Sequence, residues 1–599
     1  MSFLVAFHTG KAPLDTADAL DFLTGEEREA LKIAGRSHHV ALVISHAGPP
    51  SLPEVGVHTL DGRNWLAGQV RLDNRDDLIA ALETSGARAG PAISDPGLCL
   101  LARSRWGSSF LEHLAGDFSF TLWDEEAQAL ICARDQLGVR LLYTACDGDL
   151  WIFSNSLERL AAIDRLDKRI DPLWVADFLT EGVTRDADRT VYRGVKRVQP
   201  AHFVILNDSG VQEQRYWRLE VPEPLYYPKL SLYLEDFHSR LSLAIAARLP
   251  EGKTGLSFSG GLDSTTLAAK IIELTGDPSR IVAHTRIFEW LIRDDELEYS
   301  QLAAKRLGIR QEILPADDLC YDPDWMDLEY TDPQPEADIV SARIEHAIAG
   351  RMSLESKVWF EGEGPDNALT FEWRPYLRWL WRKGARGKAI SASASYVQTT
   401  SLAEWRTAAG RVLRLNSPWK QSAPEMMPDW IDPGFVRSVD LETRITDARN
   451  SRQSIHPWRP KAHASFNSPI WQALFQTWDS TYSGIPIEWR HPYIDLRVLE
   501  FMLRVPPLPW SRHKAILREA MRGKLPREVL KRPKTPLREN PLDLMLSRHP
   551  LPELAADSPV AAYVVPARLP KCRECSGEAA NSLLKVHALD HWLRRRRYS

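Results

Sequence analysis

The chain has 599 residues, more than one hydrophobic core usually supports, so we expect more than one domain. Its 44% hydrophobic and 26% charged residues are typical of a globular protein, and a net charge of −5 gives no reason to expect nucleic acid as a partner. No apolar run approaches the roughly 18 residues that a membrane span needs, which argues against a membrane partner.

The cysteines and the N-terminus both favour a cytoplasmic protein. The segment 1–8 lacks the basic stretch of a signal peptide. The six scattered cysteines do not form the pattern of a disulfide framework. Cys572 and Cys575 form a single C-x-x-C without a second pair, which is too little for a four-ligand zinc site, and their role stays open.

The first half of the chain reads as short strands separated by turns, with helices beside them. Strand patterns occur at 3–7, 39–45, 116–123, 130–134 and 150–154. Such a series predicts stacked β-sheets with flanking helices. A proline-rich stretch, 221–228, follows Tyr216-Trp217 and should be extended, so we predict domains at 1–217 and 218–599.

The second half alternates strands and helices, which predicts a parallel sheet with ligands at the carboxyl ends of its strands. An apolar strand beginning at Thr254 leads into a glycine turn and a helix. A strand at 280–285, a helix at 296–307 and a strand at 357–360 follow. We expect almost everything after Asn367 to be helical.

The glycine turn is the most informative segment. It reads Ser259-Gly-Gly-Leu-Asp-Ser264 and opens a helix, so its backbone N–H groups form a concave site for an anion. Gly260 and Gly261 allow close approach of the main chain, and the serine hydroxyls add donors. Asp263 can hold a magnesium ion against phosphates. The turn lacks the Gly-Lys-[Ser/Thr] of a Walker loop.

Several motifs, in the same order, resemble the asparagine synthetase superfamily over nearly the whole chain. The glycine turn resembles the pyrophosphate loop of ATP pyrophosphatases, and Glu361-Gly-Glu-Gly-Pro-Asp366 resembles the family's Ser-Gly-Glu-Gly-x-Asp loop. Further matching segments are 68–74, 116–124, 133–140, 296–308, 491–495, 514–520 and 532–534. The resemblance implies an α+β Ntn-hydrolase-like glutaminase domain, followed by an α/β domain of the ATP pyrophosphatase (adenine nucleotide α hydrolase-like) fold.

The resemblance fails at the glutaminase site. Active members carry cysteine directly after Met1, whereas this chain has Ser2. The family binds glutamine through Asn-Gly-Glu, whereas here the segment is Ala67-Gly68-Gln69. Serine can act as an N-terminal nucleophile, but the substrate contacts are lost as well. We therefore interpret the first domain as a structural or peptide-docking relic.

The resemblance also implies roles for residues of the second domain. It assigns Asp263 and Asp366 to Mg²⁺, and Glu363 to positioning or deprotonating an amine. Lys534, and less directly Lys514, would contact the transferring phosphate. Asp495 we expect to be structural. The ATP site would be formed by Leu256, Ser257, Ser259, Gly260, Gly261, Asp263, Ser264 and Gly362.

Among the members, the lasso-peptide macrolactam cyclases resemble the chain most, through segments 70–78 and 362–369. These enzymes adenylate an Asp or Glu side chain of a peptide, which its α-amine then attacks. β-Lactam synthetases place tyrosine where Glu363 stands. Asparagine synthetases usually continue the loop as Asp-Glu-x-x-Gly-Gly, whereas Asn367 follows Asp366 here.

An aromatic run at 371–381 follows this loop and has two interpretations. It could present a contact surface to a peptide, or pack as a helix into the core.

We therefore predict an AMP-forming amide ligase that uses ATP and Mg²⁺ and acts on a precursor (core) peptide beside a leader peptidase. The alternatives are an ammonia-using asparagine synthetase, a β-lactam synthetase-like enzyme and a peptide-binding scaffold without activity. tRNA thiolation would need additional cysteines and a basic surface.

Overall fold

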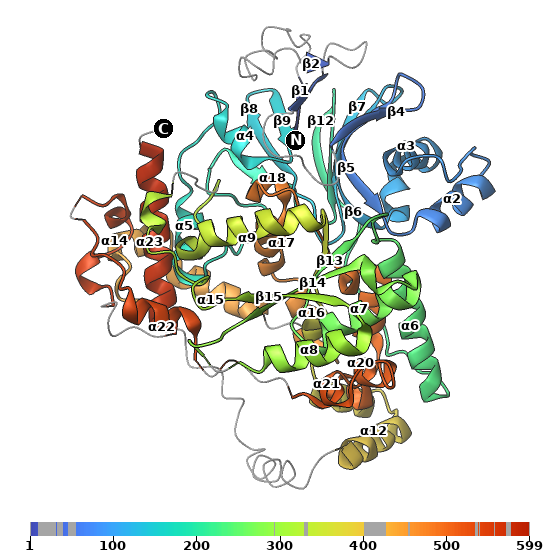
Figure 1. The fold of residues 1–599 in the computed structure, drawn as a ribbon. Coiled ribbons are helices and arrows are strands. Elements are labelled where there is room, and N and C mark those ends of the chain that lie inside the picture. The colour runs from blue at the N-terminus through green and yellow to red at the C-terminus, as the bar shows by residue number, and fades with distance from the viewer. Residues whose placement is uncertain are drawn as a thin grey trace.

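The computed structural model describes residues 2–9, 31–32, 40–45, 55–292, 294–328, 333–399, 427–452, 456–533, 537, 539–555, 557–570 and 577–597. Two stacked sheets form the first half, and a parallel sheet with many helices forms the second (Figure 1). The predicted fold class is confirmed. The division between residues 217 and 218 stays a prediction.

The first half contains two six-stranded antiparallel sheets, in the orders β10-β8-β9-β1-β3-β2 and β12-β11-β7-β6-β5-β4. Their strands are β1 (Ser2–His8), β2 (Leu31–Lys32), β3 (Val40–Ser45), β4 (Gly56–Thr59), β5 (Trp65–Leu72), β6 (Gly116–Asp124), β7 (Ala129–Arg134), β8 (Tyr143–Asp147), β9 (Leu150–Ser154), β10 (Val195–Arg197), β11 (His202–Asn207) and β12 (Gly210–Arg215). The sheets face each other across alternate residues such as Phe3, Val5 and Trp123, which are almost fully buried.

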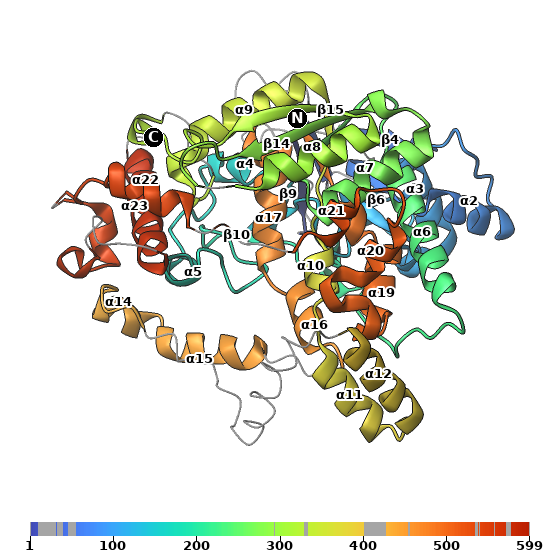
Figure 2. The same ribbon diagram turned by 60° about the horizontal axis from the view of Figure 1, so that its bottom comes forward.

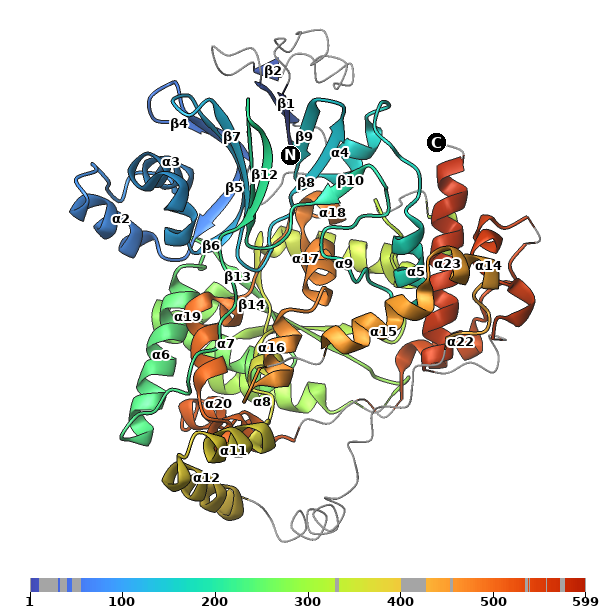
Figure 3. The same cartoon turned by 180° about the vertical axis from the view of Figure 1, so that it is seen from behind.

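Helices cover the outer faces of both sheets. The helices α2 (Arg75–Thr84) and α3 (Asp95–Trp106) pack on β5 and β6. The helices α4 (Leu157–Ala162) and α5 (Pro172–Glu181) cover the other sheet. The long C-terminal helix α23 (Glu578–Arg597) lies beside α5 (Figure 3). The end of the chain therefore contributes to the core of its first half.

The second half is built on a parallel sheet in the order β15-β14-β13-β16-β17. The strands are β13 (Thr254–Ser257), β14 (Ile281–Ile287), β15 (Arg310–Pro315), β16 (Val358–Phe360) and β17 (Glu488–Arg490), and the first helices are α6 (Leu230–Ala246), α7 (Leu262–Thr275), α8 (Glu296–Leu307) and α9 (Ala342–Glu355). Leu256, Ala283 and Phe360 are buried in the largest core cluster. Near-continuous apolar strands are expected where both faces of a parallel sheet are covered.

The remaining chain is largely helical. Its helices are α10 (Pro365–Ala368), α11 (Trp373–Arg382), α12 (Arg386–Thr399), α14 (Pro433–Ser438), α15 (Leu441–Arg452), α16 (Pro460–Phe466), α17 (Ile470–Trp478), α18 (Ser480–Ser483), α19 (Leu496–Arg504), α20 (Ala515–Ala520), α21 (Arg527–Lys531) and α22 (Pro541–Arg548). Figure 2 shows α11 and α12 at one end of the molecule, away from the first half. No helix in the described ranges is long and apolar enough to cross a membrane.

One strand lies in the largely helical region after Asn367. Glu488–Arg490 forms β17, which pairs with β16 in parallel. The short charged sequence has no strand periodicity. Its charges are instead satisfied inside the protein, because Glu488 accepts from Arg140 at 2.6 Å and from Arg490 at 2.7 Å.

Arg248 joins the two halves through a buried network of ion pairs. Its guanidinium lies 2.8 Å from a carboxylate oxygen of Asp73, in the first half, and 2.6 Å from one of Asp495. All three side chains are at most 5% exposed. Burial opposes ionisation of Asp495, but Arg248 and Arg497 outweigh it and lower its pKa to about 2. Asp495 is therefore structural, as expected from the sequence.

Replacing Arg248 with methionine should destabilise the protein by about 3–5 kcal/mol, because Asp73 and Asp495 would remain buried without their partner. The matched change Arg165→Met breaks the exposed pair with Asp147 and should cost less than about 1 kcal/mol. Chemical denaturation measures both. Equal losses would contradict the role of this network.

Candidate functional site

The predicted anion-binding turn lies between β13 and α7. Gly260 has φ +63°, and a Cβ there would lie 2.4 Å from the backbone nitrogen of Ser300. Because α8 packs this tightly onto the turn, only glycine fits. Gly261 caps α7, whose first N–H groups have no intrahelical acceptor and point out of the helix end.

The serine hydroxyls of the turn lie next to each other. The Oγ atoms of Ser259 and Ser264 are 3.4 Å apart, and the backbone N–H of Gly261 donates to Ser259 Oγ at 3.3 Å. These are long contacts that an incoming acceptor could replace. Hydroxyls, helix N–H groups and the positive end of the helix dipole together favour a phosphate group here.

Lys514 connects the two aspartates that the sequence predicts as metal ligands. Its Nζ lies 2.5 Å from Asp263 Oδ2 and 2.7 Å from Asp366 Oδ1. Asp263 is in the first turn of α7, and Asp366 is in the first turn of α10, after β16. The structure therefore brings Asp263, Asp366 and Lys514 together, although they are far apart in the sequence.

The backbone around Lys514 is strained. His513 and Lys514 have φ +49° and +54°, a region that non-glycine residues rarely adopt. The Arg518 side chain holds the turn by donating to the backbone oxygen of His513 at 2.6 Å. This strain directs the lysine between the two carboxylates.

The donor set fits the Mg²⁺ that the family resemblance implies. One cation already lies within 2.7 Å of an oxygen from each aspartate, and carboxylate oxygens are the ligands that Mg²⁺ prefers. The Tyr493 hydroxyl donates to the backbone oxygen of Asp263 at 3.0 Å, which fixes the start of α7. Asp263 and Asp366 are thus the residues that would hold the ion.

The turn opens into a cavity of about 740 Å³. Many of its lining side chains are acidic: Asp263, Glu336, Asp338, Glu345, Glu361, Glu363 and Asp366. Arg286 also lines it, paired with Glu345 at 2.6 Å. The volume lies in the range of small-molecule sites. Gly362 and the exposed Glu363, just after the end of β16, also line the cavity.

Sequence reasoning missed Glu361. It follows β16 and accepts a hydrogen bond from Ser257 Oγ at 2.5 Å, so it connects two predicted loops. Burial, together with the neighbouring charge of Glu363, raises the pKa of Glu361 to about 7. The Ser257 hydrogen bond and the charge of Arg286 act in the opposite direction but do not outweigh burial. The signal was present in the sequence, because the family motif has serine at this position.

The side chain of one predicted site residue, Leu256, does not line this cavity. The side chain of Leu256 is fully buried in the core, so it is not exposed to a ligand in the cavity. Lys534 lies outside the described residues. Two positions earlier, Arg532 donates to the backbone oxygen of Ser259 at 3.3 Å and pairs with Glu296 at 2.8 Å. Arg532 therefore contacts the anion-binding turn.

The positions of the family's glutaminase site are packed inside the first half. Ser2 is 7% exposed, and Gln69 is fully buried. Asn74, which matches the family in sequence, accepts from the backbone N–H of Ala115 at 3.0 Å and donates to the backbone oxygen of His113 at 2.9 Å. The Asn74 side chain thus fixes the start of α2 to the segment that leads into β6.

Part of the aromatic run packs into the core and part of it is exposed, so each interpretation fits some of its residues. Tyr376 and Leu380 on α11 are buried in the core, whereas Trp381 is 53% exposed. Trp373 stacks on Tyr396 at 4.6 Å between ring centroids, and Arg512 lies over the Tyr396 ring at 5.6 Å. One face of α11 is core, and the other carries aromatic rings towards the segment that holds Lys514.

The cysteine expectations are tested only in part. Cys99, Cys132, Cys146 and Cys320 are free thiols. Cys572 and Cys575 lie outside the described residues.

The fold and this site define a two-domain protein with an ATP-pyrophosphatase-type loop. Comparison with known families matches residues 57–217 to the glutamine amidotransferase domain and residues 236–594 to asparagine synthase. The chain belongs to the asparagine synthase family.

Individual relatives are distant. The chain is 28% identical to "Amidase chyE" of Penicillium rubens over 309 residues, which cover 49% of this chain but only 44% of that protein. It is 22% identical to "Asparagine synthetase [glutamine-hydrolyzing] 3" of Bacillus subtilis over 491 residues, or 78% of this chain and 74% of the relative. The chain therefore spans less than half the length of the first relative.

Among solved structures, glutamine phosphoribosylpyrophosphate amidotransferase from B. subtilis aligns over 54% of this chain and 73% of its own, with 14% identity. Its TM-score of 0.25 is too low for the likeness to support a conclusion.

Gly260→Ala should abolish the rise in melting temperature that Mg-ATP produces, because the turn must move away from α8 to admit the methyl group. Gly276→Ala is the matched control, since Gly276 also has positive φ but open space around it. That change should cost only about 1–2 kcal/mol of stability and preserve the response to Mg-ATP. A retained response in Gly260→Ala would contradict the assignment of the loop.

Glu361→Gln should change how stability depends on pH. The folded-state pKa of about 7 exceeds the ordinary glutamate value of 4.5, so the wild type loses stability as pH rises between these values. The variant lacks this loss, so its stability relative to that of the wild type should rise by up to about 3 kcal/mol between pH 4.5 and 8. Melting curves at both pH values test this, and a constant difference would contradict it.

Proposed function

We propose that the protein is an ATP-dependent amide ligase that activates a carboxylate as an acyl-adenylate, and that its reaction is macrolactam closure of a lasso-type peptide. The observation that carries the proposal is the convergence of the Ser259–Ser264 turn, Asp263, Asp366 and Lys514 at one edge of the parallel sheet. A pyrophosphate leaving group needs such an anion site with cationic and metal-binding groups beside it.

In this mechanism the substrate carboxylate attacks the α-phosphorus of ATP, and pyrophosphate leaves into the turn. The N–H groups of α7 and the hydroxyls of Ser259 and Ser264 stabilise its charge. Bound Mg²⁺, held by Asp263 and Asp366, would neutralise phosphate charge. Lys514, and Lys534 as the resemblance implies, would contact the transferring phosphate.

The amide bond forms when an amine attacks the acyl carbon and AMP departs. Glu363, exposed at the edge of the cavity, positions the amine or accepts its proton. A peptide α-amine is the preferred nucleophile because Ser2 and Gln69 replace the family's glutaminase residues and are packed inside the first half. The aromatic face of α11 and Tyr396 is suited to a peptide beside the site.

A peptide substrate implies further partners. Its α-amine must be freed from a leader, so a leader peptidase should act beforehand, and we propose that both work in the cytoplasm. Neither a nucleic acid nor a membrane is required.

The second candidate is an asparagine synthetase that uses free ammonia, which the family assignment favours. A β-lactam synthetase-like reaction is less favoured because Glu363 stands where those enzymes have tyrosine. A scaffold without activity would need no convergence of Lys514 on two carboxylates.

Pyrophosphate release distinguishes these candidates. The purified protein is given Mg-ATP with either aspartate plus ammonia, or a precursor peptide encoded near its gene together with the neighbouring peptidase. We expect release only with the peptide, with AMP formed and a peptide product lighter by one water. Release with aspartate and ammonia would identify an asparagine synthetase instead. The absence of pyrophosphate release under all conditions would overturn the ligase proposal.

Asp366→Asn should reduce pyrophosphate release by at least about 100-fold, because half of the carboxylate pair at the phosphate site is lost. Asp208→Asn changes an exposed turn residue in the first half and should leave the rate unchanged. Equal rates for the two variants would exclude Asp366 from the reaction.

A further inference from the structure

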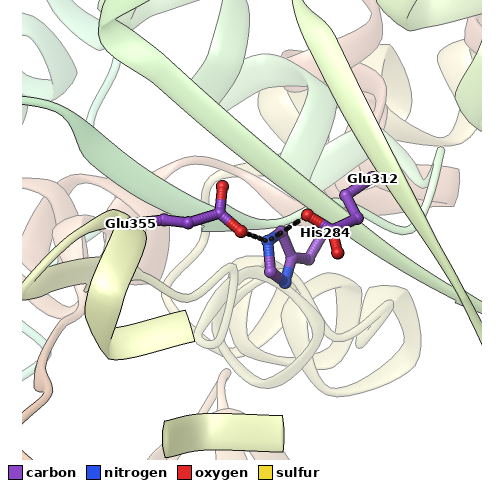
Figure 4. A group of neighbouring side chains, drawn as sticks. All are labelled: His284, Glu312 and Glu355. Atoms are coloured by element: carbon purple, nitrogen blue, oxygen red, sulfur yellow. Dashed lines mark hydrogen bonds and ion pairs between the residues drawn. The ribbon is translucent and has the colours of Figure 1, made fainter. Parts of the chain in front are cut away.

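A second group of ligand-type side chains lies on the parallel sheet, next to the strand β13 that leads into the anion-binding turn. His284 on β14, Glu312 on β15 and Glu355 at the end of α9 point toward one another (Figure 4). His284 and Glu312 are register partners on neighbouring parallel strands. Three elements therefore converge on one point, and the pyrophosphate chemistry proposed above uses none of these residues.

We propose that His284, Glu312 and Glu355 bind a divalent transition-metal ion of the Zn²⁺ class. His284 Nε2 lies 3.2 Å from Glu355 Oε1 and 3.6 Å from Glu312 Oε2. Tetrahedral coordination with bonds of about 2.0 Å puts neighbouring ligand atoms roughly 3.3 Å apart. All three candidate ligand atoms lie within 4.8 Å of one another. The two distances from His284 are therefore close to those between the ligand atoms of a tetrahedral site.

Hydrogen bonding alone does not satisfy this group. A single proton on His284 Nε2 serves Glu355 at 3.2 Å but leaves Glu312 at 3.6 Å, beyond a good hydrogen bond. His284 is 6% exposed, and its Nδ1 has no hydrogen-bond partner within the described part of the chain. The imidazole is held instead by an edge contact with Trp359 at 4.7 Å.

The charge balance also favours a dication. Two carboxylates face a single imidazole, and the adjacent cation is Arg351, 3.1 Å from the other oxygen of Glu312. Glu355 is the last residue of α9, where the negative end of the helix dipole adds attraction for a cation. Imidazole with carboxylates suits Zn²⁺ and its transition-metal neighbours rather than Mg²⁺. The carboxylates are 26% and 32% exposed, so an ion could enter.

Such an ion would join α9 to the sheet beside the main cavity. Glu345, Ala349 and Met352 on α9 line that cavity, as does His284 itself. The site would therefore fix the position of one cavity wall. The proposal does not depend on which reaction takes place there.

The test is titration of the chelator-treated full-length protein with Zn²⁺, and with Co²⁺ for its visible spectrum. Cys572→Ser/Cys575→Ser serves as the background, so that this cysteine pair contributes no site. In excess Mg²⁺, which the Asp263–Asp366 pair would take, we expect one Zn²⁺ or Co²⁺ ion per chain, a tetrahedral Co²⁺ spectrum and a further rise in melting temperature with Zn²⁺.

His284→Ala and Glu355→Gln should each weaken Zn²⁺ binding by more than about 100-fold, since even changes around a metal's ligands cost 10–100-fold. Glu519→Gln on α20, where the side chain is 41% exposed, should have no effect. Absence of stoichiometric Zn²⁺ binding to the background protein would overturn the proposal, as would equal affinity in Glu355→Gln. Pyrophosphate release is measured separately, so its failure would leave this result unaffected.

Discussion

The buried guanidinium of Arg248 is the constraint on which the arrangement of the two halves depends. It lies between a carboxylate that follows β5 and another that precedes α19, and all three groups are shielded from water. The penalty for burying these charges is offset only while both halves are in place. The geometry of the parallel sheet and its cavity is therefore coupled to the packing of the first half of the chain.

The sequence predicted the regular parts of the molecule well. The pattern at 296–307 matches α8 residue for residue, and the glycine turn lies between a strand and a helix as expected. These features depend on local periodicity and on residues with special backbone freedom. The strand β17 could not be predicted in this way. Its Glu488 is stabilised by a hydrogen bond from Arg140, which lies 348 positions away in the sequence.

The candidate site was predicted in its parts but not in its connections. Asp263 and Asp366 stood out as acidic residues after strands, whereas their common contact with Lys514 depends on two successive residues with positive φ. The raised pKa of Glu361 comes from burial beside Glu363. The motif shows that glutamate replaces serine at this position, but it does not show that the position is buried. Long-range convergence and desolvation are the terms that the sequence leaves undetermined.

The packing of α23 against α5 also bears on how the chain folds. Val586, Leu589 and Trp592 complete the same cluster that begins with Leu4 and Ala6 on β1. Strand β1 and helix α23, far apart in the sequence, therefore share one hydrophobic cluster. Contacts of such long sequence separation slow folding and leave apolar surface exposed in the meantime. A folding intermediate in which α23 has not yet docked would leave part of this cluster exposed.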